Sequence, residues 1–212
     1  MTTTTTEAPE QQVATPLSAQ GITKVYAVQH AQIATVLTDA VGAAATYGEW
    51  FDVPGIKSLV LSGDMDTKQL RGDNRLIDQE VMITGLTAKF ENAKLSLQNL
   101  AVMLGGTVGV RTAGATSAYA GTGWAMQSSA SPKSFGLRAI SATADAPGGA
   151  VAFVMSKCAL SGFPEIGAAE EDYQIVSGEV NVNPPNGTSP WLDVIVMDTY
   201  APPAPWLPDS ST

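Results

Sequence analysis

The two segments at residues 56–70 and 76–95 constrain the fold of this chain more than any other part of it. Both alternate apolar and polar side chains, and a period of two is typical of a half-buried β-strand. The first segment places Leu59, Leu61 and Met65 on one face and Ser58, Ser62 and Asp64 on the other. The second places Leu86, Ala88 and Phe90 opposite Thr87, Lys89 and Glu91. Their spacing predicts one long antiparallel hairpin.

The residues between these segments are predicted to form the hairpin turn, because Gly and Asn tolerate a positive φ. They are Arg71, Gly72, Asp73 and Asn74. The first three also form an RGD adhesion triplet, and Asn186-Gly187-Thr188 matches an N-glycosylation sequon. Both motifs lie where turns are already expected, and motifs this short arise by chance. We therefore interpret both as turns.

A short helix is predicted directly after the hairpin. Leu97, Leu100, Ala101 and Leu104 fall at i, i+3, i+4 and i+7, which places them on one helical face. Ser96 can cap the first turn, and Gly105-Gly106 can supply a left-handed stop. Because only one face is apolar, we expect the helix to pack against a sheet.

Further strands are expected on both sides of the hairpin and helix, at residues 24–32, 124–128, 135–142, 151–158, 173–182 and 191–198. Residues 107–123, rich in Gly, Ala, Thr and Ser, are expected to form a long loop. This pattern predicts a mainly β fold of two packed antiparallel sheets, a β-sandwich or partial barrel. One short α-helix and long loops flank the sheets.

The two ends of the chain differ in composition from its middle. Residues 1–20 form an N-terminal arm of low complexity that has little to bury, so we expect it to be flexible in a free subunit. Residues 201–212 contain four prolines and favour an extended C-terminal tail. The β domain is therefore predicted to occupy residues 21–200.

Few residues are suited to catalysis or metal binding. His30 is the only histidine and Cys158 the only cysteine, too few for a usual zinc site. No nucleophile motif accompanies His30, and Asp64 and Asp66 lack the other ligands of a calcium loop. We expect no catalytic residue, metal or cofactor. A hydrolase that uses His30 stays open, because a catalytic triad is defined by geometry rather than by chain order.

Negative charge is concentrated in the last third of the chain. Residues 145–212 carry nine acidic residues and one lysine, a net charge of −8 out of −9 for the whole chain. Such a surface repels phosphate, so gripping nucleic acid by counterion release is not expected. No apolar run is long enough to span a bilayer, and residues 1–16 lack the features of a secretory signal.

Residues 22–107 as a whole resemble the major tail tube proteins of long-tailed, non-contractile bacteriophages. The resemblance is carried by residues 47–48 (YG), 52–59 (DVPGIKSL), 68–74 (KQLRGDN), 83–85 (ITG), 94–96 (KLS) and 100–106 (LAVMLGG). These stretches follow the order of the family: first strands, a long hairpin with an RGDN-type turn, then a short helix. From Thr107 onward the resemblance is weaker.

The resemblance implies a structural virion protein whose hexameric rings stack into a hollow tail tube. Sheets of adjacent subunits would form one continuous inner barrel, through which the genome passes into the host. The implied partners are further copies of this chain, a tape-measure protein and tail-end proteins. Double-stranded DNA would pass without specific binding, and the chain would not insert into a membrane. Its expected location is the virion tail, after synthesis in the host cytoplasm.

Within such a tube, acids of the last third are candidates to line the lumen. If Val176, Val180 and Val182 point to the core, Glu179 points the other way, because strand neighbours alternate. We rank Glu179 first, followed by Asp172, Glu171 and Glu170, although the same acids can equally coat the outer wall.

The main alternative is an extracellular adhesion or glycan-binding module built on a β-sandwich. The RGD triplet, the sequon and the Thr-rich N-terminal arm favour it. The lack of an export signal in residues 1–16 counts against it.

Overall fold

The computed structural model describes residues 25–72, 75–92, 94, 96–114, 119–128, 131–143, 148–166 and 176–200. The predicted N-terminal arm and C-terminal tail lie outside these residues. So do Asp73 and Asn74 of the predicted turn and the candidate lumen acids Glu170, Glu171 and Asp172.

Most of the described chain is antiparallel β-sheet, as predicted. One large sheet contains β1 (Val25–Thr38), β2 (Thr46–Tyr47), β3 (Phe51–Asp52), β4 (Ile56–Gly72), β5 (Arg75–Asn92), β8 (Phe135–Thr143), β9 (Ala150–Leu160), β10 (Glu165–Ile166), β11 (Val176–Val182) and β12 (Leu192–Met197). A second sheet contains β6 (Thr107–Arg111) and β7 (Gly121–Ala125). The described helix is α2 (Leu97–Leu104).

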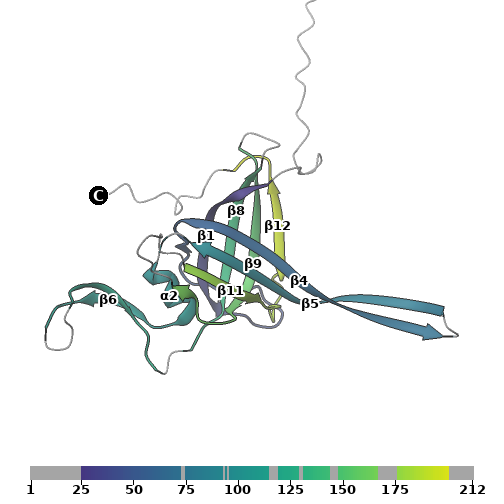
Figure 1. Cartoon of the computed structure of the whole chain (residues 1–212), viewed down its shortest axis with the longest axis horizontal. Helices are drawn as coiled ribbons and strands as arrows, with labels where there is room; N and C mark the ends of the chain where they lie inside the picture. The colour runs from purple at the N-terminus through teal and green to yellow at the C-terminus, as the bar shows by residue number, and fades with distance from the viewer. Residues whose placement is uncertain are drawn as a thin grey trace, which may run out of the picture.

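The large sheet divides at β9. One edge of β9 pairs with β8, whereas the other edge pairs with β12 at residues 150–155 and with β11 at residues 158–160. Through β11 the sheet continues to β5 and β4, and β4 comes back to lie beside β1. In Figure 1, β4 and β5 cross over β1, β8 and β9. The divided sheet therefore forms two layers and does not close into a barrel by pairing between the described strands.

The core lies between the two layers. Ile33 of β1, Phe135 of β8 and Met155 of β9 face Phe90 of β5 and Val180 of β11, and all are buried. The predicted alternation in β5 and β11 is confirmed, because Ala88, Phe90, Val180 and Val182 are buried while Lys89 and Glu91 are exposed. The side chain of Val176 is not among those described.

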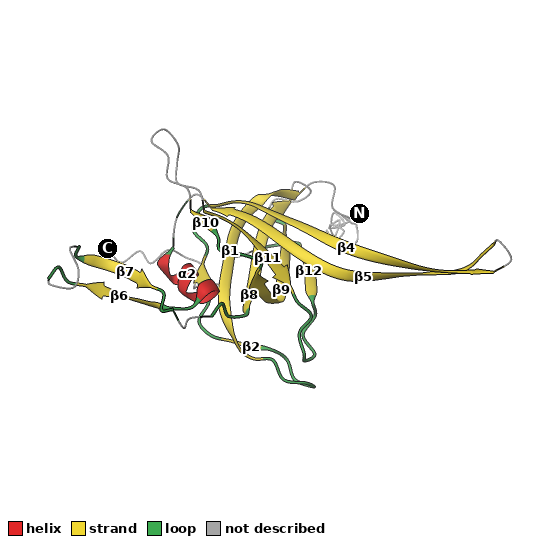
Figure 2. Ribbon diagram, turned by 60° about the horizontal axis from the view of Figure 1, so that its bottom comes forward, coloured by secondary structure: helices red, strands yellow, loops and turns green. Residues whose placement is uncertain are grey.

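Helix α2 covers one end of this core (Figure 2). It begins and ends where the sequence predicts: the Ser96 hydroxyl accepts from the Asn99 N–H, and Gly105 follows with φ 77°. Leu100 and Leu104 are buried, whereas Leu97 and Ala101 are only partly buried. Asn99, Val102 and Met103 are buried as well, so the packed face is wider than the predicted stripe.

The predicted loop at residues 107–123 is wrong, because β6 and β7 form a hairpin there. Gly, Ala and Thr give little apolar alternation, so the strand signal is weak. The hairpin is joined to the end of α2 by Trp124, whose Nε1–H donates to Gly105 O at 2.9 Å. Gly106 has φ 93°, and a Cβ there would lie 2.4 Å from Ala125 O. Only glycine fits at position 106 without displacing the backbone of Ala125.

The predicted turn is also too long. Arg71 and Gly72 are the last two residues of β4 and pair with Leu76 and Arg75. The pairing of Gly72 with Arg75 leaves two residues to connect the strands. The hairpin is thus longer at its tip than the sequence indicates.

The packing of α2 is tested by Leu100→Asp. Leu100 is 3% exposed and contacts the core, so an unpaired carboxylate there should lower the free energy of unfolding by more than about 3 kcal/mol. Gln98→Asp on the exposed side of the same helix is the control and should leave stability nearly unchanged. Urea denaturation measures both. Equal stability of the two variants would contradict this packing.

Candidate assembly surface

The distal part of the β4–β5 hairpin projects away from the two-layered body (Figures 1 and 2). The strands stay paired from Ile56 and Asn92 at the base to Gly72 and Arg75 at the end. Every described side chain at residues 62–69 and 78–84 is exposed. We call residues 64–72 and 75–84 the extension.

One face of the extension carries exposed apolar side chains close to the body, and the polar pair of Gln69 and Gln79 continues it farther out. Met65 pairs with Ile83, and Thr67 pairs with Val81, so these four side chains share this face. Met65 is 68% exposed, Ile83 58% and Val81 53%. Met65 follows the parity of Leu59 and Leu61 as predicted, but it lies beyond the core that those residues contact.

The opposite face of the extension is mostly charged. Asp66 pairs with Met82, and Lys68 pairs with Glu80. Charged residues on one side and Met65, Val81 and Ile83 on the other make the part of this ribbon near the body amphipathic, which a hairpin surrounded by water does not need.

A β-bulge creates this arrangement. Asp64 pairs with Gly85, but the next pair is Met65 with Ile83, so Thr84 is an extra residue in β5. From that point the alternation of β5 is shifted by one residue. The shift brings Ile83 and Val81 onto the face of Met65.

Glu179 faces away from the core, as predicted, on the outer face of the β11–β5–β4 layer. It pairs in register with Lys89, and the two side chains form an ion pair of 2.9 Å. Both are well exposed, 41% for Glu179 and 62% for Lys89, so the pair contributes little to stability. The Ser62 and Thr87 hydroxyls share a hydrogen bond of 2.7 Å on the same face. Glu91 and Glu165 line the same hollow as Lys89 and Glu179, so this part of the surface carries more negative than positive charge.

Two strand edges have no ladder partner among the described strands. β12 pairs with β9 alone, and β4 pairs with β5 alone. On β12, Val194 and Ile195 point to opposite faces and are 51% and 42% exposed. Open edges with exposed apolar side chains are a liability for a solitary subunit.

A groove opens between β1 and β4 beside one of these edges. Its volume is about 450 Å³, and its walls include Val25, Tyr26 and Val28 of β1, Leu61 of β4 and Phe153 of β9. Tyr26 is 50% exposed. The groove is lined mainly by apolar groups, and Lys57, Ser58 and Ser141 are its polar lining residues.

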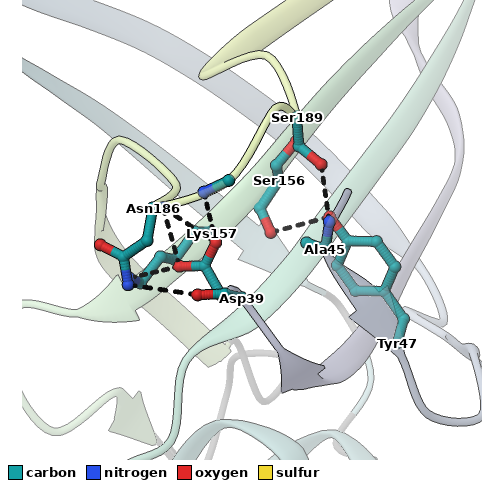
Figure 3. A network of polar contacts seen from close by, with 8 residues as sticks. Asp39, Ala45, Tyr47, Ser156, Lys157, Asn186 and Ser189 are labelled. Atoms are coloured by element: carbon teal, nitrogen blue, oxygen red, sulfur yellow. Dashed lines mark hydrogen bonds and ion pairs between the residues drawn. The ribbon is translucent and has the colours of Figure 1, made fainter. Parts of the chain in front are cut away.

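A group of polar contacts joins three segments that are far apart in the sequence (Figure 3). Asp39, just after β1, accepts from Lys157 Nζ of β9 at 2.7 Å. Its carboxylate also accepts from the backbone N–H groups of Asn186 at 2.8 Å and Gly187 at 3.2 Å. We call these four residues the clamp. The Lys157 ammonium and the two amides hold the pKa of Asp39 below its usual range, against a smaller opposing effect of desolvation.

The loop that carries Asn186 and Gly187 is fixed along its length. Thr188 N–H donates to Ala43 O at 2.9 Å, and Ala45 N–H donates to Ser189 Oγ at 2.9 Å. A Cβ at Gly187 would lie 1.9 Å from Ala43 O, so a side chain at this position has no room. The chain bends at residues 186–189, where a turn is predicted, and this loop is also bound to residues 43–45.

The described residues offer little for catalysis. Cys158 is fully buried, and desolvation raises the pKa of its thiol to about 12. The ring of His30 lies 6.3 Å from that of Tyr200. Within the described ranges, no group of three or more His, Cys, Asp or Glu side chains is arranged to hold a metal ion. In the same ranges, no helix is long and apolar enough to cross a bilayer.

Two comparisons with known proteins give no relative. No protein-family model matches the chain, and a search of curated proteins finds no significant match.

Sequence reasoning missed the extension's apolar face and the clamp. Val81 and Ile83 were not assigned a face, although an abrupt change of alternation before Gly85 is the signal of a bulge. Asp39 and Lys157 are separated by 118 residues, so no local pattern pairs them. The sequence predicts only a turn at Asn186-Gly187.

The clamp predicts a pH-dependent stability. Because the folded-state pKa of Asp39 is lowered, its contribution is present above the unfolded pKa of about 3.9 and is lost as pH falls through the folded value. We expect the stability difference between wild type and Asp39→Asn to shrink below about pH 4. Urea denaturation of both proteins at a series of pH values measures it. A difference that is constant with pH would contradict the ionised clamp.

Proposed function

We propose that this chain is a structural subunit that assembles with copies of itself into stacked hexameric rings. The rings form the hollow tail tube of a long-tailed bacteriophage, the conduit for delivery of the genome into the host. The observation that carries this proposal is the exposed apolar face of the extension, at Met65, Val81 and Ile83.

The exposure of Met65, Val81 and Ile83 is explained if a neighbouring copy of the chain covers these side chains. Burying apolar surface contributes about 25 cal/mol per Å², so covering three large side chains favours association. The face lies on a projecting hairpin rather than on the body, so it fits a different surface of the neighbouring copy. Contacts of this heterologous kind generate rings when they close and filaments when they do not.

The unpaired strand edges support the same proposal. The edges of β12 and of β4 can each continue into the sheet of an adjacent copy. The apolar groove beside Val25 and Tyr26 offers a receiving surface next to one of them. Rings built in this way would have a continuous β-sheet wall.

The surface charge suits a conduit for a polyanion. The net charge of −8 in residues 145–212 disfavours binding wells for phosphate along the path. We place Glu179 on the lumen side, together with Glu91 and Glu165, which line the same hollow and leave it net negative beside Lys89. DNA would then pass without specific contacts. The remaining proposed partners are a tape-measure protein and tail-end proteins of the virion tail.

The alternative function, an adhesion module, is favoured by one observation. Arg71 and Gly72 of the RGD triplet are the last two residues of β4, at the far end of the extension. Such a module needs no assembly, so the oligomeric state separates the two proposals.

Assembly is tested by two neighbouring substitutions on opposite faces of the extension. Ile83→Asp places a charge on the apolar face and should prevent rings and tubes, with thermal stability of the subunit nearly unchanged. Met82→Asp, on the charged face and 41% exposed, is the matched control and should assemble. Electron microscopy and light scattering of concentrated protein give the readout. A strictly monomeric wild type, or assembly of both variants alike, would contradict the proposal.

The position of Glu179 is tested by charge reversal in assembled tails. Glu179→Lys leaves two lysines in register, and in the lumen they should slow or stall DNA ejection. The double variant Lys89→Glu with Glu179→Lys restores a neutral pair and should eject DNA as wild type does. Both sites are exposed, so stability should change by less than about 1 kcal/mol. Normal ejection by the single variant would place Glu179 on the outer wall.

A further inference from the structure

Asn186 and Gly187 form the dipeptide that is most prone to deamidation in flexible chains. The backbone nitrogen of the glycine, once deprotonated, attacks the Asn side-chain carbonyl carbon. The new N–C bond closes a succinimide ring while the C–Nδ2 bond breaks and ammonia leaves. Water then opens the ring to aspartate or isoaspartate. Glycine favours this reaction because it has no Cβ to restrict the approach.

In this structure the attacking nitrogen, Gly187 N, is hydrogen-bonded to the carboxylate of Asp39. Gly187 N–H donates to Asp39 Oδ1 at 3.2 Å, and Asn186 N–H donates to the same carboxylate at 2.8 Å. The Asn186 side-chain Nδ2 donates to Asp39 O at 3.4 Å, as Figure 3 shows. Both reacting groups of the dipeptide are therefore bound to one residue from a distant part of the chain.

We infer that Asn186 is a latent deamidation site and that Asp39 protects it. Deprotonation of Gly187 would place an amide anion directly beside a carboxylate, which like-charge repulsion opposes. The hydrogen bond also stabilises the protonated nitrogen. Lys157 holds the Asp39 carboxylate in position through their 2.7 Å ion pair.

The conformation opposes the reaction as well. Succinimide formation requires the Asn186 carboxamide to swing onto the Gly187 nitrogen, which breaks the contact of Nδ2 with Asp39 O. The adjacent backbone cannot follow freely, because Thr188 N–H is bound to Ala43 O and Gly187 lies against Ala43. Reaction therefore needs local opening of the clamp.

Once formed, the product keeps the clamp open. Aspartate at position 186 adds a negative charge close to Asp39, and isoaspartate adds a methylene to the backbone between the two amides. Neither product restores the original set of hydrogen bonds. Deamidation at this site is thus a one-way release of the loop before β12.

The experiment compares deamidation rates of folded proteins at mildly alkaline pH. Peptide mapping by mass spectrometry and isoaspartate labelling quantify the reaction at Asn186, and a synthetic peptide of residues 183–191 sets the unprotected rate. Folded wild type should react at least about tenfold more slowly than the peptide, as expected if opening breaks a charged hydrogen bond. Asp39→Asn should approach the peptide rate.

Two further variants keep the test decisive if Asp39→Asn folds poorly. Lys157→Met leaves the carboxylate but removes its ion pair, and it should accelerate the reaction to an intermediate rate. Thr188→Ala keeps both backbone amides bound and should react as wild type does. Equal rates for wild type and peptide would overturn the inference. So would a wild-type rate in a folded Asp39→Asn or Lys157→Met protein.

Discussion

The two-sided pairing of β9 is the constraint on which the rest of the structure depends. Its first residues are held between β8 and β12, and its last residues between β8 and β11. Because β11 and β12 follow one another along the same edge, the sheet must part there into two layers. Met155 and Cys158 of β9 then point into the space enclosed, where neither is exposed at all. The core, the position of α2 and the loop between β11 and β12 all follow from this division.

Local periodicity predicted the parts of the fold whose partners are close in sequence. Leu86, Ala88 and Phe90 alternate without interruption, and the spacing of Leu100 and Leu104 matches one helical turn, so β5 and α2 were predicted correctly. The apolar face of the extension was not predicted. The unpaired Thr84 shifts which residues of β5 face each side of the ribbon, and the amino-acid composition of the segment gives no sign of that shift. The clamp was not predicted either. Asp39 and Asn186 are 147 residues apart, and only the tertiary fold brings them together.

Two lysines, Lys157 and Lys89, form ion pairs that have different effects. Lys157 is the only base in residues 145–212, and it is mostly buried against Asp39. Lys89 forms an ion pair with Glu179 at the surface. The first pair fixes a loop, whereas the second mainly reduces the local field, because exposed ion pairs add little to stability. The same type of interaction thus has a structural role in one place and an electrostatic one in the other.

The extension also has a consequence of scale. Nine paired residues at roughly 3.3 Å each give it a reach of about 30 Å beyond the body. That is about three times the spacing of roughly 10 Å between two packed sheets. In the proposed assembly, a copy bound at the tip would therefore stand well away from a copy that contacts the body. Bending or stretching of the assembly would be concentrated in this two-stranded span rather than in the packed core.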